Sequence, residues 1–151
     1  MNILFLDIDG PLKSGRAFAF LKPHVDRGNW DNLSVQAVNM ICEKTNAKIV
    51  FSSTWNAMGL EELTKVAQAQ GITGHIVGIT EFPNLDYRLD AIKLWLQEHQ
   101  YVERWVCLDD VTLQHDHCLK VDFNSGISYQ NYSDAIRLLG GTVGELVDVS
   151  C

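Results

Sequence analysis

Ile3-Leu4-Phe5-Leu6-Asp7-Ile8-Asp9-Gly10, residues 3–10, is a short apolar run that leads into two carboxylates. Apolar residues that follow one another without alternating polar positions are typical of a strand that is covered on both faces. Runs of the same kind recur at residues 47–51, 75–79 and 105–108, and a weaker one lies at residues 119–123. We therefore predict a sheet of short strands that is buried on both sides.

Helical patterns separate these predicted strands. Apolar residues recur at helical spacing in four stretches: Val35, Val38, Ile41 and Cys42; Leu60, Leu63, Val66 and Ala67; Leu85, Leu89, Ile92 and Leu96; and Ala135, Ile136 and Leu139. Asp31 and Asn32 are suitable N-caps for the first helix, and Gly140-Gly141 ends the last. Strands that alternate with helices form βαβ units, so we predict an α/β fold, a Rossmann-like three-layer sandwich with a mainly parallel central sheet.

Length and composition set the class of protein. The chain has 151 residues, of which 46% are hydrophobic and 21% charged. These values exclude a disordered chain or a coiled coil, and they suit a single domain over residues 1–151. No apolar stretch approaches the ~18 residues of a membrane span, and the start lacks a basic leader, so we expect a cytoplasmic protein without a membrane partner. The four cysteines form no Cys-x-x-Cys pair, which favours reduced thiols.

Polar side chains stand where three of the predicted strands end. Asp7 and Asp9 follow the first strand, Ser52-Ser53-Thr54 the second, and Asp109-Asp110 the strand at residues 105–108. Because the carboxyl ends of parallel strands share one edge of a sheet, where ligands bind, we expect these groups to meet.

Four carboxylates at one edge repel each other. Two of them ~4 Å apart repel by roughly 4 kcal/mol at an effective dielectric constant near 20, so the group needs a bound cation or raised pKa values. All the available donors are oxygens, which favours Mg²⁺. An oxygen-bound Mg²⁺ that faces hydroxyl groups is a place to hold a phosphoryl group.

These residues resemble the motifs of the haloacid dehalogenase (HAD) superfamily of phosphohydrolases. Asp7-Ile8-Asp9-Gly10 looks like its first motif, Ser52 its second, Arg88 or Lys93 its third, and Asp109-Asp110 its fourth, in the expected order. The resemblance covers residues 1 to about 125. Residues 50–55, Arg88, residues 108–110 and residues 125–127 are also similar to the HAD domain of Swiss Army Knife RNA repair proteins.

The resemblance implies a Mg²⁺-dependent phosphomonoester hydrolase that acts through an aspartyl-phosphate. Asp7 would be the nucleophile, and Asp9 would protonate the leaving oxygen and then activate water. The metal would be held by Asp7, by the backbone carbonyl of Asp9, and by Asp110, with Asp109 beside it. Gly10 is followed by Pro11 instead of the family's usual Thr or Val, so hydroxyl support from that position is absent.

The resemblance also implies a set of phosphate-binding side chains. Ser52, with Ser53 next to it, would hold the phosphoryl group, and Arg88 would offset its charge, with Lys93 as the alternative cation. Other interpretations remain open: Ser53 and Thr54 suit a helix cap, and Arg88 suits a solvated helix charge near Asp86 or Asp90. A non-catalytic module that binds a phosphorylated ligand is a further alternative.

Two other stretches bear on function. His115-Asp116-His117-Cys118 has metal-ligating residue types, but they are crowded in sequence without a partner set, which favours a surface turn or a supporting role over a zinc site.

Residues 11–30 match neither a helix nor a strand pattern, and we expect a small flap or irregular hairpin, with no large cap. Four basic residues, Lys13, Arg16, Lys22 and Arg27, stand there against Asp26 alone, in a chain of net charge −7. Phe18, Phe20 and Trp30 lie among them, an arrangement that suits nucleobase stacking and also suits pinning the flap to the body. We expect a phosphorylated substrate, with a nucleic-acid or nucleotide end favoured and a metabolite or phosphoprotein as alternatives; no obligate protein partner is inferred.

Overall fold

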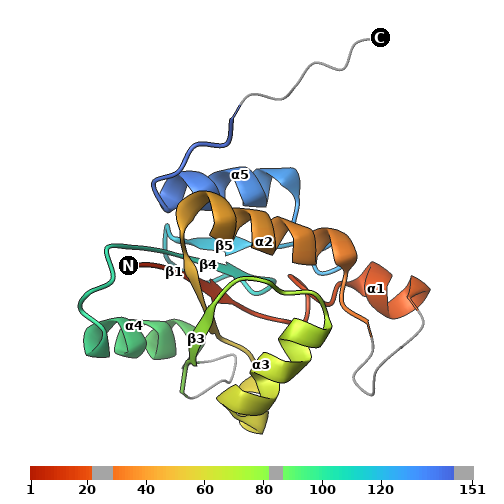
Figure 1. Ribbon diagram of the computed structural model, residues 1–151, viewed down its shortest axis with the longest axis horizontal. Helices are drawn as coiled ribbons and strands as arrows, with labels where there is room; N and C mark the ends of the chain where they lie inside the picture. Colours follow the sequence, from red (N-terminus) through yellow and green to blue (C-terminus); the bar gives the residue numbers. More distant parts are fainter. Residues whose placement is uncertain (22–28, 82–86, 145–151) are drawn as a thin grey trace.

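A computed structural model describes residues 1–21, 29–81 and 87–144, and a parallel five-stranded sheet lies at its centre (Figure 1). The strands lie in the order β3 (Ile76–Ile79), β2 (Lys48–Phe51), β1 (Asn2–Leu6), β4 (Arg104–Asp109) and β5 (Cys118–Lys120). β1 is therefore central, with Leu6 paired to Phe51 on one side and to Leu108 on the other. The predicted parallel sheet is confirmed.

Helices cover both faces of this sheet (Figure 1). They are α1 (Gly15–Phe20), α2 (Asn32–Thr45), the 3-10 helix η1 (Thr54–Met58), α3 (Leu60–Ala69), α4 (Arg88–Glu98) and α5 (Tyr129–Leu138). Buried side chains of α2, α3 and α5 share one hydrophobic cluster, whereas those of α4 belong to a second cluster. The three-layer α/β sandwich predicted from the sequence is confirmed, and no large cap lies among the described residues.

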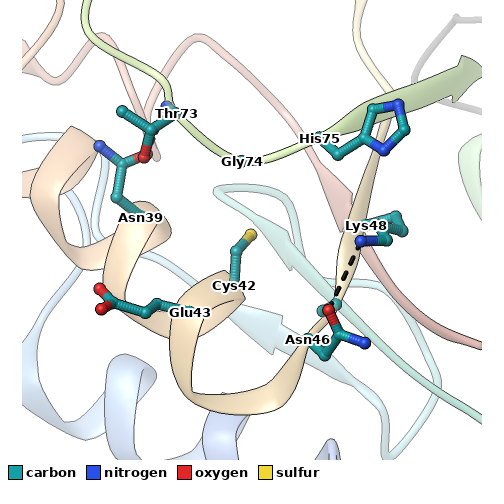
Figure 2. Close-up of a pocket in the computed structure, with 9 residues that line it drawn as sticks. Asn39, Cys42, Glu43, Asn46, Lys48, Thr73, Gly74 and His75 are labelled. Atoms are coloured by element: carbon teal, nitrogen blue, oxygen red, sulfur yellow. Dashed lines mark hydrogen bonds between the residues drawn. The ribbon is translucent and has the colours of Figure 1, made fainter.

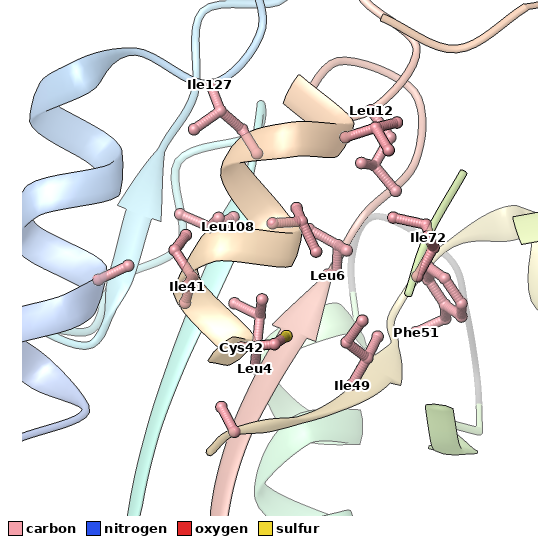
Figure 3. Packing of buried hydrophobic residues seen from close by; sticks show 14 of the residues in the cluster. Leu4, Leu6, Leu12, Ile41, Cys42, Ile49, Phe51, Ile72, Leu108 and Ile127 are labelled. Carbon is pink, nitrogen blue, oxygen red and sulfur yellow. The ribbon is translucent and has the colours of Figure 1, made fainter. Parts of the chain in front are cut away.

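Alternation along β1 divides the core between the two layers. Leu4 and Leu6 point to the larger cluster, where Figure 3 shows them packed with Ile41 of α2. Ile3 and Phe5 point to the smaller cluster, with Ile92 and Trp95 of α4. Each such buried side chain contributes about 1.5–3 kcal/mol, so the strand that carries Asp7 and Asp9 is fixed from both sides.

The expectation of an irregular flap over residues 11–30 is wrong for residues 15–20, which form α1. The Ser14 hydroxyl accepts a hydrogen bond from the Ala17 amide, and Arg16 forms an ion pair with buried Asp31. Burial alone would raise the pKa of Asp31, but hydrogen bonds from Arg16, Ser14 and Ser34 outweigh it and lower that pKa. A six-residue helix held by such contacts is too short to show a periodic pattern.

Trp30, at the end of the same stretch, is 1% exposed and packs edge-to-face on Trp55, so this ring pins the segment to the body. Lys22, Asp26 and Arg27 lie outside the described residues.

Two further expectations concern the described chain as a whole. None of its helices combines the length and the apolar character that crossing a membrane requires. Cys42, Cys107 and Cys118, the cysteines within the described residues, are unpaired thiols, as expected.

Candidate active site

Asp7 and Asp109 lie side by side where β1 and β4 end. The Asp7 amide donates a hydrogen bond to the Leu108 carbonyl at 3.1 Å, which continues the pairing of the two strands by one residue. Both carboxylates are almost fully buried, at 3% and 1% exposure. Arg88, the first residue of α4, is also buried, and its Nη1 lies 2.9 Å from Asp7 Oδ2 and 2.6 Å from Asp109 Oδ2. One guanidinium therefore bridges two carboxylates away from bulk water.

The charges of this trio do not balance. Burial raises the pKa of Asp7 to about 8; the neighbouring charge of Asp109 adds to the rise, and Arg88 opposes it. Burial raises the pKa of Asp109 as well, although Arg88 again acts in the other direction. Burial disfavours the charged form of Arg88, but Asp7 and Asp109 more than compensate and raise its pKa, so the guanidinium stays charged. A further cation would satisfy the remaining negative charge.

Asp110 completes a group of oxygens that suits a metal ion. Asp7, Asp109 and Asp110 each offer one carboxylate oxygen, and these three atoms lie within 4.8 Å of one another. Gly10 makes room for Asp110: its φ is +106°, and a Cβ atom there would stand 2.7 Å from the Asp110 Cβ. The structure thus brings together three of the four predicted metal ligands. Oxygen donors with an excess of negative charge are the kind of ligand set that Mg²⁺ prefers.

The Asp9 side chain stands apart from that group. It is half-buried, and its Oδ2 accepts a hydrogen bond from the indole Nε1 of Trp55 at 3.2 Å. The turn after β1 fixes its backbone, because the amides of Leu12 and Lys13 both donate to the Ile8 carbonyl. Asp9 is thus held beside the cluster by an indole rather than by the other carboxylates.

The two serines after β2 have different surroundings. Ser52 is 1% exposed, and within the described part of the chain its hydroxyl has no hydrogen-bond partner. A buried hydroxyl without a partner costs about 1–3 kcal/mol, which a bound phosphoryl oxygen would remove. The Ser53 hydroxyl instead accepts a hydrogen bond from the Trp55 amide as the N-cap of η1. Ser53 therefore has the helix-cap role that the sequence left as an alternative.

The structure also separates the two candidate cations. Arg88 bridges the carboxylates, as described above. Lys93 is exposed on the same helix and forms no ion pair with the clustered carboxylates in the described residues. Arg88 is therefore the basic residue that α4 brings to this site, and the interpretation of Arg88 as a solvated charge is wrong.

His115 and His117 form ring contacts with Trp105, and the His117 amide donates to His115 Nδ1 at 3.0 Å. Asp7, Asp109 and Asp110 are the one metal-ligating group found among the described residues, so a zinc site at residues 115–118 has no support.

Trp55 also belongs to the candidate site, although no sequence motif marks it as a functional residue. Its indole fixes the carboxylate proposed as acid, and its ring packs on Trp30. The available signal was its place three residues after Ser52, within the stretch that resembles the second motif. A side chain that binds through one ring nitrogen leaves no distinctive pattern in a single sequence.

A polar pocket lies at the opposite edge of the sheet, near the amino ends of β2 and β3 (Figure 2). Asn39, Glu43, Lys48 and His75 line it, together with the Cys42 thiol. Burial raises the pKa of Cys42 to about 12, so this thiol is protonated and unreactive near neutral pH. The carboxylates that cluster among the described residues, and the arginine that contacts them, lie instead at the carboxyl edge.

No curated protein and no solved structure matches the chain. One family model does match it, over residues 3–132, and this range contains every residue of the site described above. The chain belongs to the family described as the HAD domain in Swiss Army Knife RNA repair proteins.

Proposed function

We propose that the chain is a Mg²⁺-dependent phosphomonoester hydrolase with Asp7 as its nucleophile. Membership of a HAD-domain family suggests a HAD-type phosphohydrolase. The observation that carries the proposal is the joint burial of Asp7 and Asp109 around Arg88, with an oxygen of Asp110 within 4.8 Å of theirs. This arrangement supplies an attacking carboxylate, a fixed positive charge and a set of oxygen ligands in one place.

The first step transfers the phosphoryl group to the protein. An oxygen of Asp7 forms a bond to phosphorus, the ester P–O bond breaks, and Asp9 gives its proton to the leaving oxygen. The products are an alcohol and an aspartyl-phosphate on Asp7. Mg²⁺ held by Asp7, Asp109, Asp110 and the Asp9 backbone carbonyl would neutralise phosphoryl oxygens that otherwise repel the attacking carboxylate.

The second step returns Asp7 to its starting state. Asp9, now a carboxylate, takes a proton from water, the water oxygen attacks phosphorus, and the Asp7–phosphorus bond breaks to release inorganic phosphate. The hydrogen bond from Trp55 keeps the Asp9 carboxylate in place for both proton transfers.

Arg88 and Ser52 support the phosphoryl group in different ways. Arg88 holds Asp7 in position through their contact at 2.9 Å, and its charge offsets negative charge that develops on the phosphoryl oxygens. The Ser52 hydroxyl donates to one of those oxygens, which gives this buried group the partner that it lacks.

The proposed substrate is the phosphorylated end of a nucleic acid or nucleotide. The family's description names RNA repair proteins, and no large cap encloses the site among the described residues. An uncapped site accepts a phosphate that projects from a large molecule. We also propose a cytoplasmic setting, in which the thiols of Cys42, Cys107 and Cys118 stay reduced.

The test is release of phosphate from an aryl phosphate with MgCl₂ and with a chelator, for the wild type, Asp9→Asn and Asp90→Asn. Asp90 is an exposed carboxylate on α4 and serves as the matched control. We expect metal-dependent turnover that Asp9→Asn lowers by about 100-fold or more and Asp90→Asn leaves unchanged. Turnover that persists in the chelator would contradict the proposal, and tight phosphate binding without turnover would favour a non-catalytic module.

A further inference from the structure

A cluster of one ammonium group and three aromatic rings adjoins the proposed acid. The Trp55 indole that binds Asp9 lies under Lys13, whose Nζ is 5.7 Å from the centroid of that ring. The same Nζ is 4.5 Å from the centroid of Phe18, and Phe18 is stacked on Phe123 with ring centroids 6.1 Å apart. A continuous path of contacts therefore leads from Asp9 to two phenylalanine rings, and we call Lys13, Phe18, Trp55 and Phe123 the aromatic cluster.

Backbone hydrogen bonds hold together the two segments that carry Phe18 and Phe123. The amides of Gly15 and Arg16 donate to the carbonyls of Phe123 and Asn124, at 2.7 and 2.9 Å. Gly15 permits this approach, since a Cβ atom there would stand 3.1 Å from the Asn124 Cα. The ion pair between Arg16 and Asp31 ties α1 to the start of α2. Two segments far apart in the sequence are thus held with their phenylalanines in contact.

These phenylalanines are exposed, in contrast to the core aromatics. Phe18 is 53% and Phe123 41% exposed, whereas Trp30, which is also near the site, is 1% exposed. The two rings therefore offer open surface to a flat ligand. Base–aromatic stacking of this kind is a common mode of binding to single-stranded nucleic acid.

Lys13 adds the charge that such a ligand requires. Its carbonyl accepts a hydrogen bond from the Gly10 amide at 2.9 Å, so its backbone belongs to the same turn as Asp9. The side chain lies over two rings, a position in which an ammonium group is favoured by cation–π attraction. A cation between the proposed phosphoryl site and an open aromatic surface matches the alternation of phosphate and base along a nucleotide chain.

We propose that the aromatic cluster binds the nucleotide that adjoins the phosphate to be removed. A base stacks on the open surface of Phe18 and Phe123, and Lys13 contacts the adjoining phosphodiester. This assignment rests on the proposed phosphohydrolase function and specifies its substrate as a polynucleotide end rather than a sugar phosphate or a phosphorylated side chain. Ribose phosphates and phosphoserine have no aromatic base to stack on the phenylalanines.

The experiment compares Phe18→Ala, Phe123→Ala and Lys13→Gln with Phe20→Ala as the control. Phe20 lies on the same helix and is 81% exposed, but it is not among the rings of the cluster. Three substrates are used: a 3′-phosphorylated oligonucleotide, the same oligonucleotide with its last two nucleotides abasic, and ribose 5-phosphate. Phosphate release gives kcat and KM for each.

We expect Phe18→Ala and Phe123→Ala to raise KM for the base-bearing oligonucleotide by about 5- to 100-fold. The same variants leave KM for the abasic oligonucleotide and for ribose 5-phosphate within about twofold of the wild-type values, because neither substrate has a base to stack. Lys13→Gln raises KM for both oligonucleotides and spares ribose 5-phosphate. Phe20→Ala matches the wild type throughout.

Binding of the fluorescently labelled oligonucleotides to Asp7→Asn, with and without the cluster variants, gives a readout that needs no turnover. Equal losses for base-bearing and abasic oligonucleotides, or no loss for either, would overturn the stacking assignment. A phosphoserine peptide that binds more tightly than the oligonucleotide would overturn the nucleotide assignment. If wild-type protein releases no phosphate from any of the substrates, the proposed hydrolase function fails, while the binding data still decide the subsite.

Discussion

The two edges of the sheet are both polar, but they differ in how they hold their polar groups. At the amino edge, Asn39 exchanges hydrogen bonds with the backbone of residues 71 and 73, and Glu43 is exposed. At the carboxyl edge, Asp7, Asp109 and Arg88 are buried together. Charges taken out of water cost several kcal/mol each before their attraction offsets the cost. Buried, incompletely satisfied charge therefore sets the candidate site apart from the other edge, whereas the presence of a pocket does not.

The largest contrast is expected from removing one carboxylate charge at each edge. Asp7→Asn should lower kcat by at least about 1000-fold, because it removes the attacking oxygen's charge. Glu43→Gln at the amino edge should leave kcat within about twofold. Steady-state phosphate release from one substrate measures both variants. Comparable losses of kcat in the two variants would contradict the proposed difference between the two edges of the sheet.

A similar pair of substitutions tests stability instead of activity. Arg88→Met leaves Asp7 and Asp109 buried without their cation, and we expect the free energy of unfolding to fall by about 3–5 kcal/mol. Lys48→Met at the amino edge should change it by less than about 0.5 kcal/mol. Urea denaturation followed by circular dichroism measures both. A loss below about 1 kcal/mol for Arg88→Met would mean that the trio is not coupled as described.

Proton and metal should compete at the carboxyl edge. Burial and the charge of Asp109 raise the pKa of Asp7 from 3.8 to about 8, so the folded state binds a proton more tightly than the unfolded chain does. The stability contributed by this proton is complete below pH ~4 and is lost as the pH rises through about 8. Mg²⁺ replaces the proton, so it should raise Tm more near pH 8 than near pH ~6.

Differential scanning calorimetry with and without MgCl₂ at the two pH values measures this difference. Asp110→Asn, which removes one of the clustered ligands, should reduce the rise in Tm at both. A rise that is independent of pH would show that the ion does not bind at Asp7.

The smallest effects should distinguish the two adjacent serines. Ser52→Ala removes the hydroxyl proposed to bind the phosphoryl group, and we expect kcat/KM to fall by about 10-fold. Because this buried hydroxyl has no hydrogen-bond partner among the described residues, its removal should raise the free energy of unfolding, by up to about 1–3 kcal/mol. Ser53→Ala removes the cap of η1, which should cost about 1 kcal/mol of stability and leave kcat/KM nearly intact. Kinetics and thermal unfolding of both variants form the test. A loss of kcat/KM in Ser53→Ala together with a loss of stability in Ser52→Ala would contradict these assignments and exchange the two roles.

The parallel topology explains why so much of the site could be predicted. Asp7, Ser52 and the Asp109-Asp110 pair each directly follow an apolar run, and the common direction of the strands brings them together. Local sequence is sufficient here because a residue just after a strand has little freedom of position. The three-layer fold follows from the same pattern of strands and helices.

The orientation of α4 could not be predicted in this way. The apolar pattern predicts that Leu85, Leu89, Ile92 and Leu96 face the core. Ile92 is buried and Leu96 packs against the smaller cluster, whereas Leu85 lies outside the described residues. The buried face of α4 also includes Arg88, Ala91 and Trp95, which the pattern does not predict. Hydrophobic periodicity assigns an arginine to solvent, whereas the buried carboxylates stabilise this one in the interior. The choice between Arg88 and Lys93 therefore required the tertiary structure.

The structure of residues 12–20 could not be predicted from the sequence, for a related reason. α1 depends on Arg16 meeting Asp31 and on pairing with residues 123–124, contacts that no local pattern reports. The aromatic cluster depends on the same pairing, because it brings Phe123 to Phe18.

The most direct test of the account is a search for the phosphorylated form of the protein itself. Protein mixed briefly with MgCl₂ and a phosphorylated oligonucleotide is quenched in acid, digested and analysed by mass spectrometry. We expect one added phosphoryl group on the peptide that contains Asp7, and none in Asp7→Asn. A phosphoryl group on another residue, or continued phosphate release by Asp7→Asn, would contradict the assignment of Asp7 as the nucleophile.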